Sequence, residues 1–77
     1  MSWAVVDGKL TRAFTFDSFL AGIAFVQQVA QIAEELDHHP DIDVRWRTIT
    51  LAVNTHDAGG AVTAKDYGLA ERIDQLA

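Results

Sequence analysis

Cysteine is absent from this 77-residue sequence, which excludes disulfide bonds, a thiolate nucleophile and zinc sites built on cysteine. Basic residues are few, with six Lys and Arg against eleven Asp and Glu and a net charge of −5. Because nucleic-acid binding depends on Lys and Arg neutralising phosphates, we expect no nucleic-acid partner. No apolar run approaches the roughly 18 residues of a membrane span, and no signal-peptide pattern opens the chain. We therefore expect a soluble, cytoplasmic protein that does not bind membranes.

Hydrophobic residues make up 49% of the chain, so it has apolar surface to bury. At 77 residues, however, a single core is only marginally sufficient for stability. The sequence shows no internal repeat, linker or low-complexity segment. We expect one domain spanning residues 1–77 that associates with further copies of itself.

A β-hairpin is predicted at the start of the chain. Asp7-Gly8 separates two short runs, residues 3–6 and 9–16, and the second run alternates apolar and polar residues. Asp-Gly is the strongest short hairpin signal, because a type I′ turn needs positive φ at both central positions.

Residues 19–36 then show helical periodicity, with Asp17 or Ser18 as the expected N-cap. Apolar residues cover about half of this helix, more than one packed neighbour requires. They form two adjacent stripes, Phe19, Ile23, Val26, Ala30 and Ala33 in one, and Phe25, Val29, Ile32 and Leu36 in the other. We expect the helix to pack on its own sheet and on another subunit, with the second stripe forming the contact of a homodimer or homotetramer.

Pro40 prevents the helix from continuing, so we expect His38 to end it and His39 to be extended, with diverging side chains. The apolar alternation that follows changes parity near Arg47-Thr48, which predicts two short strands or one strongly bent strand.

The last element is predicted to be a helix that Thr63 and Asp66 open as a capping box and that reaches Leu76. The resulting order is β-β-α-β-β-α. It favours an α+β fold in which both helices pack on one face of an antiparallel sheet.

Three histidines, His38, His39 and His56, are the candidates for chemistry, and all fall at element ends or in loops, where functional residues are frequent. Glu34 precedes His38 by one helical turn, so its carboxylate can meet and orient that imidazole. Imidazole accepts and donates protons near neutral pH, which indicates acid/base catalysis. Each histidine taken singly is also consistent with an ordinary surface position.

A zinc or iron site is the less favoured hypothesis, because the helical His-x-x-x-His pair is missing and adjacent, diverging histidines seldom chelate one ion. Gly59-Gly60 lacks the context of a phosphate-binding loop, and no serine has a nucleophile setting. We therefore expect no metal and proton transfer rather than covalent catalysis.

Together these residues resemble the pterin-4a-carbinolamine dehydratase family. Its pattern is a glutamate, three residues, His-His-Pro, an aromatic residue, then Thr-His before a Gly-containing loop and a Thr/Ser-x-x-Asp helix start. Here the pattern reads Glu34, His38-His39-Pro40, Trp46, Thr55-His56, Gly59-Gly60 and Thr63 through Asp66. The resemblance covers nearly the whole chain.

The resemblance implies an enzyme that dehydrates 4a-hydroxytetrahydropterin to quinonoid dihydropterin in tetrahydrobiopterin recycling, without a metal or an organic cofactor. It implies His38, His39 and His56 as catalytic residues, and substrate-binding positions at Glu34, Asp37, Thr55 and Asp66. The alternative is a non-catalytic module that binds pterin or mediates assembly.

Two departures from the family pattern bear on these expectations. Family members usually carry a helix before the first strand, and we expect this chain to lack it. One extra residue between His56 and Asp66, within residues 60–62, makes the role of Asp66 less secure than that of the histidines.

Overall fold

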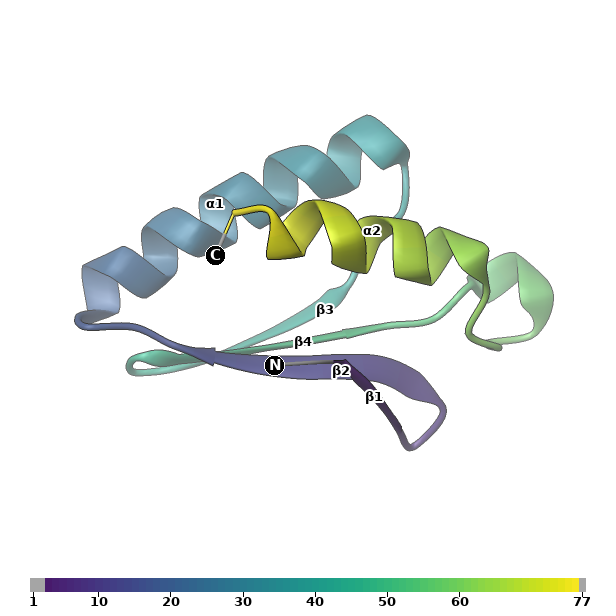
Figure 1. Cartoon of the computed structure of the whole chain (residues 1–77), viewed down its shortest axis with the longest axis horizontal. Helices are drawn as coiled ribbons and strands as arrows, with labels where there is room; N and C mark the ends of the chain where they lie inside the picture. Colours follow the sequence, from purple (N-terminus) through teal and green to yellow (C-terminus); the bar gives the residue numbers. More distant parts are fainter. Residues whose placement is uncertain (1–2, 77) are drawn as a thin grey trace.

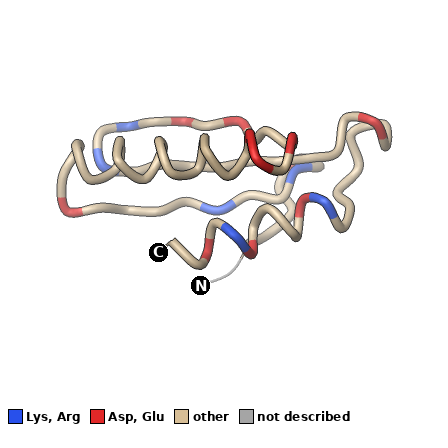
Figure 2. Tube along the Cα trace, turned by 90° about the horizontal axis from the view of Figure 1, so that it is seen from above, with Lys and Arg blue, Asp and Glu red and all other residues tan. Residues whose placement is uncertain are grey.

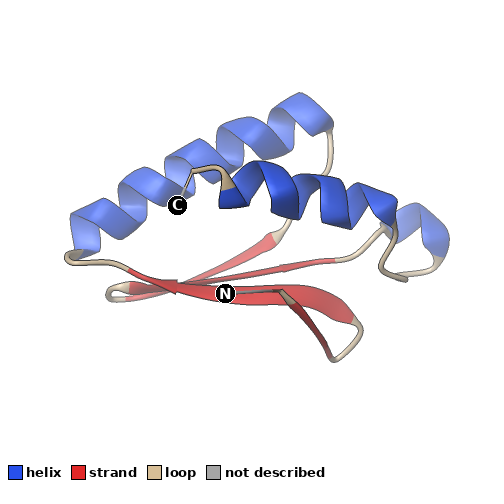
Figure 3. Cartoon of the chain, in the orientation of Figure 1, coloured by secondary structure: helices blue, strands red, loops and turns tan. Residues whose placement is uncertain are grey.

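The computed structural model describes residues 3–76 and has four strands and two α-helices (Figure 1). The elements are β1 (Ala4–Val6), β2 (Lys9–Thr15), α1 (Phe19–Leu36), β3 (Asp41–Arg45), β4 (Thr48–Val53), the short 3₁₀ helix η1 (His56–Ala58) and α2 (Ala64–Asp74). All strand pairs are antiparallel, in the order β1-β2-β4-β3. Both helices cover the same face of this sheet (Figure 3), so the predicted α+β fold is confirmed.

Tight turns join the strands of each hairpin. Asp7 and Gly8 have φ of 51° and 80°, as the predicted type I′ turn requires. Trp46, also at positive φ, and Arg47 form the turn between β3 and β4. The second half of the sheet therefore consists of two short strands and not one bent strand.

The core lies between the sheet and the helices. Inward-facing residues of β2 and β4 meet α1 and α2, and the aromatic rings interlock, with the Phe25 centroid 4.8 Å from Phe14 and 4.9 Å from Phe16. The buried cluster comprises Leu10, Phe14, Phe25, Val29, Ile32, Ile49, Leu51, Val53, Leu69, Ala70 and Ile73. Burial of these side chains is the main force that holds both helices on the sheet.

The expectation that the stripe of Phe25, Val29, Ile32 and Leu36 forms a subunit contact is wrong for its first three residues. Those three side chains are buried in the chain's own core, with Val29 fully inaccessible, because they face β2 and β4, whereas Leu36 is 40% exposed. Of the two stripes, the other is the more open, and Phe19 at its start is 46% exposed.

Both α-helices begin where the sequence predicts. The Ser18 side chain accepts the amide hydrogen bond of Ala21 at the start of α1, and the predicted capping box opens α2. The ends differ slightly: His38 lies two residues beyond α1, and α2 stops at Asp74, before Leu76. Neither helix is long and apolar enough to cross a membrane.

Candidate active site

A left-handed residue at the end of α1 positions His38 and His39. Asp37 has φ of 51°, and its amide bonds back to the carbonyls of Ala33 and Glu34. The amide of His38 bonds to the Ala33 carbonyl at 3.0 Å, the long-range bond of a Schellman motif. The chain thus reverses sharply, and the two histidines leave the helix axis.

A closed loop after β4 positions His56. The Thr55 amide bonds to the Ala61 carbonyl at 2.9 Å, and the Gly60 amide bonds back to the Thr55 carbonyl at 3.1 Å. Gly59 and Gly60 both have positive φ, which a residue with a side chain would adopt only with strain. The loop therefore presents His56 from a defined backbone.

These two segments and the first turn of α2 border one cavity of about 350 Å³ that all three histidines line. The remaining lining residues are Asp37, Asn54, Thr55, Asp57 and Lys65. Three separate elements contribute, the end of α1, the loop with η1, and the first turn of α2. Histidines that lie 18 residues apart in the sequence thus face the same space.

His38 is held by Asp66, the residue that also caps α2. Asp66 is fully buried; one oxygen lies 2.6 Å from His38 Nε2, and the other accepts the Thr55 hydroxyl at 2.8 Å and the Thr63 amide at 2.7 Å. Each of the two carboxylate oxygens therefore has at least one hydrogen-bonding partner.

The pKa of Asp66 follows from these contacts. Burial raises the pKa, but the hydrogen bonds from His38, the Thr63 amide and Thr55, together with the charge of His38, outweigh it and lower the pKa below its ordinary value of 3.8. The carboxylate is therefore ionised near neutral pH and can only accept, so His38 Nε2 carries the proton. His38 Nδ1 has no hydrogen-bond partner among residues 3–76 and is free for a ligand.

The predicted contact between Glu34 and His38 is wrong. Glu34 lies 2.5 Å from His39 Nε2 instead, because the left-handed Asp37 takes His38 off the helical face that the spacing rule assumes. Figure 2 shows acidic residues at the C-terminal end of α1, where the helix dipole disfavours them. Each of the two glutamates there has a partner, since Glu35 binds Arg72 at 3.0 Å.

The predicted site residues separate into two groups. Asp37 and Thr55 line the cavity with the histidines, whereas Glu34 and Asp66 contact a histidine and do not line it. Sequence reasoning missed Asp57 and Lys65, although each adjoins a residue that it selected. Within the described part of the chain, no group of three or more possible metal-ligating side chains occurs.

A scan of family models matches residues 1–76 to the model described as pterin 4 alpha carbinolamine dehydratase. Relatives named "Putative pterin-4-alpha-carbinolamine dehydratase" include one from Mycobacteroides abscessus, 54% identical over 72 residues that cover 94% of this chain and 76% of that protein. Another, from Mycolicibacterium smegmatis, is 53% identical over 74 residues, covering 96% of this chain and 78% of the relative.

Solved structures share the fold. A transcriptional coactivator/pterin dehydratase from Brucella melitensis superposes with a TM-score of 0.89 at 33% identity, covering 99% of this chain and 82% of that one. A pterin dehydratase-like protein identified as a RuBisCO assembly factor of the alpha-carboxysome gives 0.84 at 24% identity, covering 100% and 90%. The second likeness concerns the fold alone.

Proposed function

This chain belongs to the pterin-4a-carbinolamine dehydratase family, and on that premise we propose that it dehydrates 4a-hydroxytetrahydropterin to quinonoid dihydropterin by histidine acid/base catalysis. The observation that carries the proposal is the cavity lined by three histidines, one of them oriented by a buried carboxylate. Recycling of tetrahydrobiopterin in the cytoplasm is the physiological role that this activity predicts.

The reaction needs one acid and one base. The C4a–O bond breaks as the hydroxyl group takes up a proton and leaves as water, and the N5 lone pair forms the C4a=N5 double bond. The N5 proton is then transferred to a base. Imidazole can fill either role near pH 7, so two histidines that line one cavity suffice.

We assign these two roles to His38 and His56. With Nε2 bonded to Asp66, His38 presents Nδ1 to the cavity, in the manner of a histidine oriented by a carboxylate. His56 reaches the same cavity from η1. Asp66 acts through His38 and is therefore a positioning residue, whereas direct contact with substrate falls to residues that line the cavity.

His39 is assigned to positioning the pterin, held by its contact with Glu34. Asp37 and Thr55 border the cavity. The Asp37 amide is hydrogen-bonded at the end of α1, so we assign the Asp37 carbonyl to the amide and amine groups at the pterin edge. The Thr55 hydroxyl donates to Asp66, and the Thr55 amide and carbonyl are bonded to Ala61 and Gly60, so we assign Thr55 to shaping the cavity and holding Asp66.

Alanine substitutions separate these roles. We expect His38→Ala and His56→Ala each to lower kcat on the order of 100-fold, and His39→Ala mainly to raise KM, when dehydration of freshly generated substrate is followed by ultraviolet absorbance. A chelator-treated sample tests the metal hypothesis at the same time. If His39→Ala loses the most turnover and His38→Ala almost none, the assignment is wrong.

We also propose that the chain forms a homodimer or homotetramer, because a 77-residue core is small and hydrophobic side chains of α1 stay accessible. Phe19 is 46% exposed and Leu20 75% exposed, so the contact would lie at this end of the helix. Sedimentation of a monomer at micromolar concentration would contradict this proposal.

A non-catalytic binding or assembly module is the second candidate function. The RuBisCO assembly factor with the same fold supports it only at the level of architecture. The histidine cavity favours the dehydratase, since a scaffold alone has no need of a carboxylate-oriented imidazole. Pterin binding by folded protein without acceleration of dehydration would favour the module.

A further inference from the structure

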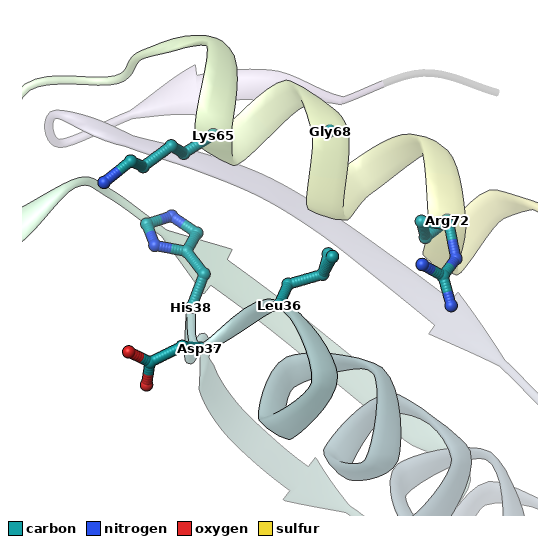
Figure 4. Close-up of a pocket in the computed structure, with 6 residues that line it drawn as sticks. All are labelled: Leu36, Asp37, His38, Lys65, Gly68 and Arg72. Carbon is teal, nitrogen blue, oxygen red and sulfur yellow. The ribbon is translucent and has the colours of Figure 1, made fainter.

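A second cavity, of about 480 Å³, lies beside the histidine cavity, between the end of α1 and one face of α2. Its lining residues are Leu36, Asp37, His38, Lys65, Gly68 and Arg72 (Figure 4). Asp37, His38 and Lys65 line both cavities, so the two join where His38 and Lys65 face each other. A ligand that occupies the first cavity can extend into the second.

The middle of this groove is apolar and open because of Gly68. A Cβ added at Gly68 would meet nothing within 4 Å, so neither packing nor backbone conformation requires a glycine there. Glycine in a helix interior is nevertheless destabilising relative to alanine. Leu36 projects toward Gly68 from the opposite side (Figure 4), which leaves a flat, apolar passage between the helices.

Cationic side chains lie at both ends of the passage. Lys65 forms no ion pair among residues 3–76. Arg72 binds Glu35 through Nη2, at 3.0 and 3.2 Å, and its Nη1 and Nε have no acceptor among residues 3–76, so both can donate to a ligand. The two residues are seven positions apart on α2, roughly 10 Å along the helix axis. The Asp37 carboxylate, which lines both cavities, is turned away from α2 (Figure 4).

We propose that this groove is a subsite for the C6 substituent of the pterin, and that it selects a long substituent with an aryl middle and a carboxylate end, as in reduced folates. The inference rests on the proposed function, which places the pterin ring in the histidine cavity. The substituent passes between His38 and Lys65, its aryl ring lies against Leu36 and Gly68, and its carboxylate accepts hydrogen bonds from Arg72.

Calorimetric titration of the full chain with stable dihydropterins tests this subsite. We expect 7,8-dihydrofolate to bind on the order of tenfold more tightly than 7,8-dihydrobiopterin, since a hydrogen bond to a charged group contributes about that factor. Arg72→Gln should remove this advantage. Gly68→Leu should also remove it by filling the passage, whereas Ala64→Leu adds the same side chain to α2 outside the groove and should keep it.

The outcomes separate the subsite from the dehydratase function. Equal affinity for the two ligands, or an advantage that survives both variants, overturns the subsite while leaving the dehydratase intact. If only 7,8-dihydroneopterin triphosphate gains affinity through Arg72, the groove binds phosphate and the aryl-carboxylate assignment is wrong. Failure of the proposed dehydratase function gives a different result: dihydrobiopterin does not bind, and the protein does not accelerate dehydration. Circular dichroism establishes folding of each variant, and Arg72→Gln remains decisive if Gly68→Leu does not fold.

Discussion

Replacing Asp66 with asparagine keeps the shape of the buried side chain and removes its charge. In the wild-type protein the Thr63 amide and the Thr55 hydroxyl donate to the same carboxylate oxygen of Asp66, and the asparagine oxygen can still accept both hydrogen bonds. Its NH₂ group then faces His38 Nε2, where two donors cannot bond to each other. His38 must therefore shift its proton to Nδ1, the nitrogen that the proposed mechanism leaves free for substrate.

Two effects of Asp66→Asn follow, and both are large enough to measure. The variant loses the hydrogen bond between His38 and a charged carboxylate, and such a bond contributes about 1.5–3 kcal/mol. The hydrogen bonds from Thr55 and Thr63 remain but become weaker because the acceptor is neutral. We therefore expect the free energy of unfolding to fall by about 2–4 kcal/mol at pH 7. A chain of this length has a total of roughly 4–12 kcal/mol, so the variant should still fold. Turnover should fall on the order of 100-fold, because His38 is then in the wrong tautomer.

Urea unfolding and the absorbance assay measure these two effects separately. Asp74→Asn is a matched control on the same helix, since Asp74 binds Trp3 and Arg12 and does not line the histidine cavity. It should lower stability and leave kcat within about twofold. Wild-type turnover by folded Asp66→Asn would refute the reasoning that Asp66 sets the tautomer of His38.

Further substitutions test other parts of the structure. The folded-state pKa of Asp66 lies below the unfolded value of 3.8. The stabilisation by its carboxylate is therefore complete above pH 3.8 and is lost as pH falls through the folded-state pKa. The difference in the free energy of unfolding between wild type and Asp66→Asn, measured by urea unfolding, should shrink below about pH 4. Phe25→Ala should cost about 3–5 kcal/mol in urea unfolding and Phe19→Ala much less, because only Phe25 is buried. Gly68→Ala should raise the free energy of unfolding by about 0.5–1 kcal/mol, seen as a higher Tm. Glu34→Gln should raise KM severalfold in steady-state kinetics and change stability by less than about 0.5 kcal/mol, since that side chain is 78% exposed.

Local signals in the sequence account for most of the fold. Asp7-Gly8 has only one strongly favoured conformation between two strands, and Ser18 and Pro40 bracket the helical period closely enough to give both ends of α1. Such signals act over a few residues, so they are readable without tertiary contacts.

The choice between the two apolar stripes of α1 was not readable in this way. Both stripes consist of apolar residues, and the positions of Phe14 on β2 and Phe16 just after it decide that Phe25 faces inward. Burial depends here on the tertiary partner and not on the helix itself.

The histidine contacts were mispredicted for a related reason. The Glu34–His38 expectation assumed a continuous helix, but Asp37 is left-handed and redirects both histidines. The partner of His38 is Asp66, 28 residues away, which reaches it only because α2 packs beside α1. A capping residue that also orients a histidine has the same sequence signature as a capping residue alone.

The rate at which freshly generated 4a-hydroxytetrahydropterin disappears, measured against protein concentration, tests the central claim most directly. We predict a rate constant that rises linearly with wild-type protein, is unaffected by a chelator, and returns to the buffer value for a His38→Ala/His56→Ala double variant with a native circular dichroism spectrum. A folded wild-type protein that leaves the buffer rate unchanged would contradict the account.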